Sequence, residues 1–439
     1  MKKPLLFIAF ISLAASSAFA GGLLTNTNQS VHFLRNPARD ASTEIDAVYT
    51  NPAGLTFLTD GLHLSFTNQS VYQTRTITST FAPFAAYNDG NTTKTFNGEA
   101  AAPIVPSFQL AYKKDNYVIS ATAAITGGGG KAVFNHGLPS SEASISMLPT
   151  LYAGLGVTKY SVNSYMEGRQ YIFGLQMNGS YKFCDSFSGA LGFRLNVVNN
   201  GYIGHLNDIK FNPGGGDMTT ASPNKNLDCT QTGWGVTPIV SLNYHLSGLN
   251  LSAKYEFRSA LNVQNNTKVD DTGLYADGVN TPQDIPAYLA LGAEYKICEK
   301  LKVSGGYHHF FDSDAKMAKD KQKYINGGIN EFLLGTEVKL NDMFLLSAGG
   351  QITRTGVTDA YQSDMSYSLN SYSIGFGGAM NITPDLRLNV AYFFTNYSDW
   401  TKTTTPTTAT NGYNGTPFAG TDVYARTNKV FGIGLDYKF

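Results

Sequence analysis

The residue types that carry chemistry occur in this sequence, but they do not form reactive sets. The three cysteines, Cys184, Cys229 and Cys298, make neither a CxxC pair nor a cluster with histidine, so we expect no metal site. His308 and His309 would project from opposite faces of a strand and could not bind one ion together. No GxSxG, P-loop or dinucleotide-binding glycine motif occurs. We therefore predict that the protein is not an enzyme and holds no cofactor.

The composition of the 439-residue chain excludes further classes of protein. Charged residues make up 15%, well below the roughly 25% of a typical soluble protein, and aromatic residues reach 13%. Lysine plus arginine and aspartate plus glutamate number 32 each, so no basic field is available for nucleic acid. Beyond the N-terminus, no apolar run approaches the ~18 residues of a membrane-spanning helix. These features indicate β structure that is compatible with a membrane.

The N-terminus has the pattern of an export signal. Lys2 and Lys3 precede an apolar stretch over residues 5–15, and Ala18-Phe19-Ala20 supplies the small-x-small pattern for cleavage before Gly21. We expect residues 1–20 to be removed, which leaves 439 − 20 = 419 residues in an exported protein.

Period-two alternation of apolar and polar residues predicts strands with one apolar face. The C-terminal segment shows it clearly, with Phe431, Ile433 and Leu435 alternating with Gly432 and Gly434. Segments of this kind predict fourteen strands, near 62–72, 106–113, 117–126, 169–184, 187–199, 234–247, 249–260, 286–298, 301–311, 331–340, 343–355, 370–383, 385–397 and 425–439.

The connections between these strands alternate strictly in length. Six are tiny, such as Lys114-Asp115 and Ser247-Gly248, and the other seven run from about 15 to 40 residues. Tight periplasmic turns and long extracellular loops are typical of transmembrane β-barrels. We therefore predict an all-β fold: a 14-stranded antiparallel transmembrane β-barrel over residues 62–439, with both ends on the periplasmic side.

Residues 21–61 do not alternate and contain two Asn-Pro-Ala triplets, Asn36-Pro37-Ala38 and Asn51-Pro52-Ala53. Asn favours the N-cap and Pro favours the first helical position, so each triplet predicts the start of a short helix. The second helix would close near Gly54. This segment is predicted to form a small helical hatch that plugs the barrel from its periplasmic side.

The chain resembles the FadL-type long-chain fatty acid transporters of bacterial outer membranes, which include uptake channels for aromatic hydrocarbons. The most specific match is DASTEIDAVYTNPAGLTFL, Asp40 to Leu58, where that family carries an NPAG-type motif in its hatch. PSFQLAYK (106–113), DIPAYLALGAEYK (284–296) and the aromatic-ending last strand match more weakly. The resemblance covers essentially the whole mature chain and implies a fourteen-stranded barrel with a hatch.

The resemblance also implies a mechanism. Extracellular loops would capture a hydrophobic ligand, the barrel interior would bind it, and it would leave laterally into the membrane where the third strand is kinked. Gly127, Gly128, Gly129 and Gly130 follow the predicted third strand, and glycines weaken and bend strands. They either form this kink or only begin the following loop.

Several apolar residues break the expected pattern and are candidates for ligand contact. Tyr288, Phe310, Leu333 and Phe393 fall on the inward register near the outer strand ends, where they would line an apolar vestibule or mark alternation fading at the rim. Phe134, Leu148, Leu151 and Tyr152 lie in a long loop, where they would bind ligand or form a local core. The inward cations Arg194, Lys254 and Arg387 could pair with a carboxylate.

The sequence therefore predicts a bacterial outer-membrane channel for passive uptake of hydrophobic compounds, with long-chain fatty acids as the first candidate and aromatic hydrocarbons as another. The alternatives are a structural or surface-recognition barrel and a polar-solute porin. Expected partners are hydrophobic small molecules, outer-membrane lipid and, through Phe439, the barrel-assembly machinery. We expect a monomer that binds no nucleic acid.

Overall fold

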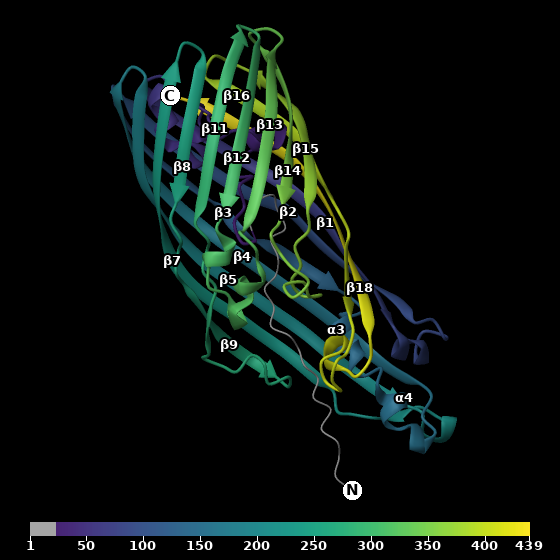
Figure 1. Ribbon diagram of the computed structural model, residues 1–439. Coiled ribbons are helices and arrows are strands. Elements are labelled where there is room, and N and C mark those ends of the chain that lie inside the picture. Colours follow the sequence, from purple (N-terminus) through teal and green to yellow (C-terminus); the bar gives the residue numbers. More distant parts are fainter. Residues whose placement is uncertain (1–22) are drawn as a thin grey trace.

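The computed structural model describes residues 23–439, so the predicted signal sequence lies outside the described residues. Fourteen antiparallel strands form a closed barrel, because β1 pairs with both β2 and β18 (Figure 1). The predicted fold class is confirmed. The strands of the wall are β1 Gly61–Phe81, β2 Thr93–Lys114, β3 Tyr117–Phe134, β4 Tyr160–Cys184, β5 Phe187–Phe211, β7 Lys225–Leu246, β8 Leu249–Glu256, β11 Tyr288–Cys298, β12 Leu301–Phe310, β13 Ile329–Lys339, β14 Phe344–Arg354, β15 Ser371–Asn381, β16 Leu386–Tyr397 and β18 Gly420–Lys438.

Long loops and short turns lie at opposite ends of the barrel, as predicted. The turns gather at the top of Figure 1 and the long loops at the bottom; we call these the turn end and the loop end. Four short strands extend the wall at the loop end: β6 Thr219–Thr220, β9 Asn262–Asp270, β10 Asn280–Pro282 and β17 Trp400–Thr404. The loops also carry short helical turns: η2 Ala82–Ala86, α3 Pro139–Ala143, α4 Leu148–Leu151, η3 Ala153–Leu155, η4 Pro213–Gly215, η5 Asp312–Asp314, η6 Ala318–Tyr324 and η7 Tyr413–Gly415.

The first three strands are longer than the sequence predicted. The outward positions of β1 include Phe66 and Tyr72, but beyond Tyr72 they are threonines, at 74, 76, 78 and 80. The strand continues to Phe81, but its outward residues are no longer apolar beyond Tyr72, so the alternation typical of a lipid-facing strand stops there. Sequence alternation therefore located the membrane-spanning part of β1 and missed its extension.

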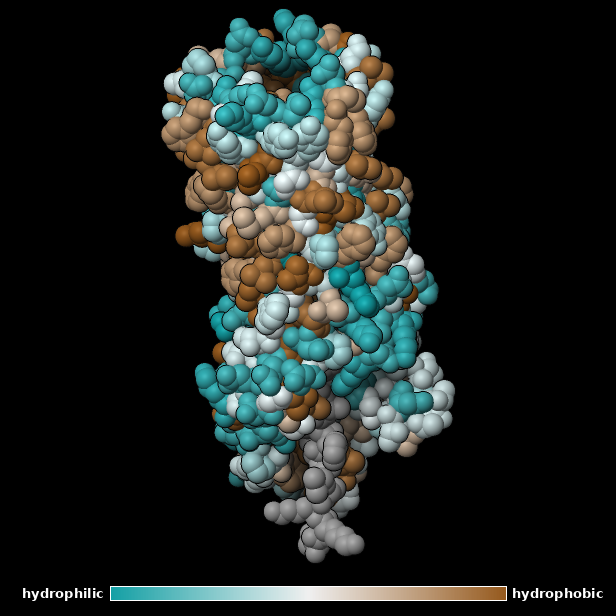
Figure 2. All heavy atoms as spheres, turned by 90° about the vertical axis from the view of Figure 1, so that its left-hand side faces the viewer, coloured by the Kyte–Doolittle hydropathy of each residue, from teal (hydrophilic) through white to brown (hydrophobic). Residues whose placement is uncertain are grey.

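A belt of outward apolar side chains surrounds the turn-side half of the barrel. On β18 it comprises Phe431, Ile433, Leu435 and Tyr437, all exposed. On the face that Figure 2 draws, apolar residues in brown cover much of the upper half, with hydrophilic residues at the top rim and predominating below. Within residues 23–439, no helix is long and apolar enough to cross a membrane.

Residues 23–60 fold inside the barrel and form the hatch. It contains α1 Val31–Arg35, α2 Ala47–Thr50 and η1 Pro52–Phe57, and nearly all of its side chains are buried. The helix α1 contacts β14, β15, β16 and β18, whereas η1 contacts β3, β4, β5 and β7 on the other side. The hatch therefore joins opposite sides of the wall.

The prediction that both Asn-Pro-Ala triplets begin helices is wrong for the first. Asn36 ends α1, and its side-chain oxygen accepts a hydrogen bond from the Ala38 amide at 3.2 Å, which forms a local turn instead. Pro52 does begin a short helix, the 3₁₀ turn η1, directly after Asn51. A triplet that favours a helix start also favours a turn, and the packing inside the barrel decides between them.

Glycines in the wall provide the space that the hatch occupies. A Cβ atom on Gly335 would collide with the Asn36 side chain, and one on Gly306 would collide with Asp40. A Cβ atom on Gly349 would lie 2.7 Å from the Pro37 ring. The hatch therefore packs directly on the backbone of the wall at these glycines, where a side chain would not fit.

We predict that Gly335→Val displaces the hatch but leaves the barrel assembled, because the new side chain needs the volume that Asn36 fills. The expected result is heat-modifiable migration like that of the wild type together with increased ion conductance in a planar bilayer. The control is Gly179→Val, at an exposed wall position where a Cβ atom has no neighbour within 4 Å. Wild-type conductance of the Gly335 variant would contradict the prediction.

Candidate functional site: a lumenal chamber beside a gap in the wall

The turn-side half of the lumen is filled by a charged network that holds the hatch. Arg39 donates to both oxygens of Asp46 at 2.8 Å and to Glu44 at 2.7 Å. Glu337 of β13 accepts from Arg35, and its second oxygen lies 2.6 Å from Lys302. Arg35, Arg39, Asp46 and Glu337 are buried, whereas Glu44 and Lys302 are partly exposed. Because the four buried groups are paired with one another, removing one of them would leave a buried charge poorly compensated.

A buried histidine makes a second connection between hatch and wall. His308 of β12 lies with one ring nitrogen 2.9 Å from Asp40 of the hatch and the other 2.8 Å from Glu331 of β13. The ring is therefore fixed at both nitrogens. This explains why His308 is buried, whereas the adjacent His309 points the other way and contacts Asn330.

The three cations predicted to pair with a ligand carboxylate already have carboxylate partners in the chain. Arg194 binds both oxygens of Glu256, at 2.7 and 2.8 Å, and Lys254 lies 2.9 Å from the same group. Arg387 reaches Glu44 of the hatch at 3.2 Å. Lys254 also donates to the Tyr49 carbonyl at 2.8 Å, so Lys254 and Arg387 tie the hatch to the wall. The pair of Arg194 and Glu256 joins strands of the wall.

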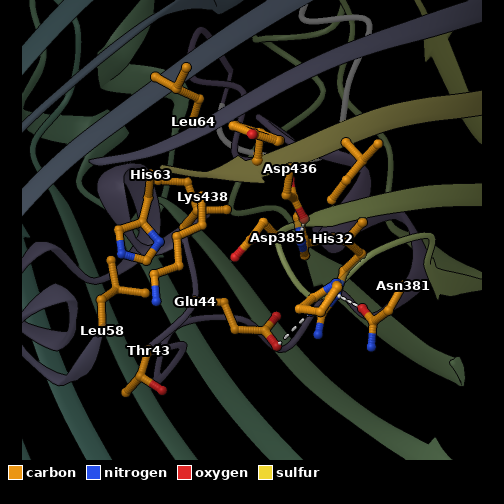
Figure 3. A pocket seen from close by; sticks show the side chains of 15 residues that line it. His32, Thr43, Glu44, Leu58, His63, Leu64, Asn381, Asp385, Asp436 and Lys438 are labelled. Atoms are coloured by element: carbon orange, nitrogen blue, oxygen red, sulfur yellow. Dashed lines mark hydrogen bonds and ion pairs between the residues drawn. The ribbon is translucent and has the colours of Figure 1, made fainter. Parts of the chain in front are cut away.

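The pocket at the turn end lies between the hatch and the wall, with Glu44, His32, Asp436 and Lys438 around it (Figure 3). His32, Glu44 and Asp46 are close enough to bind a metal ion. However, Arg39 already occupies both carboxylates, and a divalent cation beside that guanidinium would be repelled. We therefore assign this cluster to hatch anchoring.

A gap opens in the wall between β2 and β3. No backbone pairing joins residues 100–107 of β2 to residues 124–132 of β3. Over the same stretch β2 stays paired with β1, and β3 stays paired with β4. Pro103 and Pro106 lie in this part of β2, and proline lacks the N–H group that a ladder requires. On β3, five residue steps from Ile125 to Gly130 face three steps on β4, so 5 − 3 = 2 extra residues bulge there.

Gly127–Gly130 therefore lie within β3 and do not begin the following loop. Gly128 and Gly130 have φ of +93° and +70°, which favours glycine. Gly127 has to be small because the carbonyl of Leu24 lies against it. The glycine run therefore forms a bulge in β3 along the stretch where β3 and β2 do not pair.

The N-terminal segment of the hatch covers this gap from the inside. Asn26 donates its amide to the Thr126 carbonyl at 2.9 Å, and Gly128 donates to Leu24 at 3.0 Å. On the opposite rim, the Ser107 hydroxyl donates to the Gln29 carbonyl at 2.6 Å. Residues 24–29 thus form hydrogen bonds with both β2 and β3 along the stretch where these two strands do not pair with each other.

In the loop-side half of the lumen, beside the gap, buried apolar side chains pack into one cluster, and we call the part of the lumen that they fill the chamber. Ala100 and Ala132 flank the gap, and the Phe134 ring lies over Gly98 next to them. The rest of the cluster consists of inward residues of the wall and of loop residues, chiefly Ile77, Phe81, Phe96, Met166, Tyr202, Tyr424, Leu138, Met147 and Tyr367. This apolar cluster therefore reaches the place where β2 and β3 do not pair.

The loop between β3 and β4 folds inward over this chamber. Glu142 of α3 is buried, lies 2.5 Å from Lys94 and accepts a hydrogen bond from Tyr160 at 2.8 Å. The Ser140 amide donates to Asp364 of another loop at 2.8 Å, and burial raises the pKa of that carboxyl group. Buried polar contacts thus fix the loop on the barrel.

The predicted ligand contacts are distributed over four separate clusters. Phe134 lines the chamber, whereas Leu148 and Tyr152 pack at the tip of the long loop and Leu151 is exposed. Leu333 and Phe393 pack on α1 of the hatch, with Phe393 5.9 Å from Phe33 between ring centres. Tyr288 stacks on Phe310 at 4.7 Å in a cluster with Leu23.

Sequence reasoning missed two arginines on the chamber wall. Arg75 of β1 and Arg426 of β18 are directly opposite each other in the register, and both point inward and are buried. The Arg426 guanidinium lies 4.9 Å from the centre of the Tyr397 ring. The predicted first strand ended at residue 72 and so excluded Arg75, but the inward parity of Arg426 was readable from the last strand.

Several solved structures resemble this fold. A Pseudomonas aeruginosa FadL homologue aligns with a TM-score of 0.67 and 14% identity, over 95% of this chain and 100% of that one. The Pseudomonas putida toluene transporter TodX aligns at 0.56 and 15%, over 91% and 95%, and the Ralstonia pickettii toluene transporter TbuX at 0.53 and 13%, over 94% and 99%. No protein-family model and no curated protein matches the sequence.

We predict opposite effects for two phenylalanines of the candidate set. Phe134→Ala should weaken binding of a hydrophobic fluorescent probe about tenfold, since it removes roughly 1.5–3 kcal/mol of apolar contact in the chamber. Phe393→Ala should leave probe affinity within about twofold and lower stability by about 3–5 kcal/mol, since it leaves a cavity against α1. Probe titration and thermal unfolding of the purified variants test both, and equal loss of probe affinity in the two variants would contradict the assignment.

Proposed function

We propose that this protein is a bacterial outer-membrane channel for the uptake of hydrophobic compounds, which enter at the loop end and leave through the gap between β2 and β3. The observation that carries this proposal is that the buried apolar cluster of the chamber reaches the gap through Ala100 and Ala132. An apolar molecule in the chamber has a short apolar exit beside Ala100 and Ala132, whereas the charged, hatch-filled half of the lumen opposes its passage.

The position of the gap supports lateral release. Outside it lies Ile104, whose side chain is 73% exposed on the lipid-facing side. The segment over residues 24–29 covers the gap from inside, so release requires this segment to move. The alternative of an open polar-solute porin is disfavoured because the hatch fills the lumen between opposite sides of the wall.

Amphipathic acids such as long-chain fatty acids are the substrates that we favour. Two guanidinium groups side by side in an apolar chamber suit a single carboxylate, which both could bind, while the chamber would hold the alkyl chain. Aromatic hydrocarbons are the second candidate, because TodX and TbuX are toluene transporters. A hydrocarbon would use the chamber without the arginine pair.

Deletion of Gly128 and Gly129 tests the exit route. Removing two residues takes away the two extra positions of β3 and keeps the inward and outward parity of the strand, so the deletion should straighten β3 toward β2. We expect uptake of radiolabelled oleate by cells to fall at least tenfold, with normal barrel assembly.

The matched control deletes Gly214 and Gly215 from the exposed loop after β5, where a Cβ atom on either glycine would have no neighbour within 4 Å. This control should transport at the wild-type rate. If the β3 deletion assembles and still transports oleate normally, the lateral exit is refuted.

Substitution of Arg75 and Arg426 by glutamine separates the two substrate classes. The double variant should bind oleate at least tenfold more weakly, because the charge-assisted hydrogen bonds to the carboxylate are lost. Toluene binding should be unchanged. Titration with both ligands checks this, and equal oleate affinity in wild type and variant would exclude the arginine pair from substrate binding.

A further inference from the structure

An apolar groove of about 720 Å³ runs along the outward face of β14, between β13 and β15. Gly350 and Ala348 form its floor. Its sides are outward side chains of the two neighbouring strands, namely Phe332, Leu334, Thr336, Tyr372 and Ile374. By contrast, the apolar belt on β18 consists of large side chains only. The wall is therefore hollowed on this side of the belt.

The fold itself does not require glycine at the floor of the groove. The φ of Gly350 is not positive, and the nearest neighbour of a Cβ atom there would be the Ser373 carbonyl at 3.3 Å. The inward glycines Gly335 and Gly349 differ, because a Cβ atom on either would collide with the hatch. The missing side chain at residue 350 thus leaves space on the outside of the barrel.

An exposed cation lies at the loop-side end of the groove. Arg354 follows Ile352 on the outward face of β14, and it donates to the Thr353 carbonyl at 3.1 Å. Within residues 23–439 no carboxylate forms an ion pair with Arg354. The outward residues of β14 from Phe344 to Ile352 are all apolar, so Arg354 marks the loop-side edge of the belt.

A second hydrogen-bond donor lies beside this cation. Asn330 of β13 is directly opposite Arg354 in the register. Its side-chain oxygen accepts a hydrogen bond from the Tyr307 hydroxyl at 2.6 Å, which leaves its NH₂ group able to donate. A guanidinium and an amide at the same level suit the oxygen atoms of a phosphate group, and the groove next to them suits an alkyl chain.

We propose that this groove binds a phosphate-bearing lipid of the outer leaflet, with an acyl chain along β14 and the phosphate group at Arg354 and Asn330. A symmetric dimer through this face would offer Arg354 no anion, because the outward residues of β13, β14 and β15 include no carboxylate. Four strands of the wall, β15, β16, β18 and β1, separate the groove from β2 and the gap. The inference rests on the proposed membrane location and not on the substrate or its exit.

The test uses protein extracted from outer membranes and titrated with phosphatidylglycerol or with phosphatidylcholine of the same acyl chains, with bound lipid counted by native mass spectrometry. We expect the wild type to bind the anionic lipid about tenfold more tightly, and Arg354→Gln to lose this preference. Gly350→Leu should weaken binding of both lipids at least fivefold, because leucine fills the floor of the groove.

The matched controls are Lys429→Gln, at an outward cation of β18, and Gly179→Leu, at an outward glycine of β4; both should bind lipid like the wild type. Ala348→Leu replaces Gly350→Leu if that variant fails to assemble. Equal wild-type affinity for the two lipids, or wild-type binding by Arg354→Gln or by the variant with a filled groove, would overturn the proposal.

A wild-type dimer that Gly350→Leu dissociates would also overturn the proposal, since it would assign the groove to a second copy of the chain. Failure of the proposed function gives a different result. If lipid binding behaves as expected but the β3 deletion transports oleate normally, the exit route fails and the lipid site stands.

Discussion

The fit of the hatch inside the wall is the constraint on which the rest of this structure depends. A closed fourteen-stranded barrel has an inward face that its own strands cannot cover, so its polar side chains need partners in the lumen. The hatch supplies them: Arg39 joins Asp46, Glu44 and Glu337, and Asp40 binds His308. Wall glycines such as Gly335 make the approach close enough for these contacts.

The same fit explains why a gap in the wall is tolerated. Unpaired backbone groups are costly in a membrane, and the interrupted stretch between β2 and β3 exposes several. Two local features create the gap, namely the prolines of β2 and the bulged glycines of β3. A tertiary contact then compensates for it, because residues 24–29 of the hatch form hydrogen bonds with both strands from inside the barrel. The gap is thus stabilised by a segment that is not part of the wall.

The apolar side chains in the lumen form two groups, one packed on the hatch and one beside the gap. Near the hatch, residues such as Phe393 and Leu333 pack against α1 and contribute to stability. On the side of the gap, Phe134, Phe96 and Ile77 line the chamber. Both groups break the polar-inside rule of open porins in the same way, so sequence parity alone does not separate a residue that packs on the hatch from one in the cluster beside the gap. What separates them is whether the hatch lies opposite.

The sequence by itself determined the barrel, because period-two alternation and the parity of loop length are local properties of the chain. It also identified Asn51-Pro52 and the glycine run at 127–130 as special positions, since proline restricts the backbone and glycine releases it wherever they occur. Only the tertiary structure decided that Asn36 ends a helix, that Arg194, Lys254 and Arg387 bind carboxylates of the chain itself, and that Arg75 meets Arg426. Those outcomes depend on which residues face one another across the lumen, and closure of the barrel brings together side chains that are hundreds of residues apart.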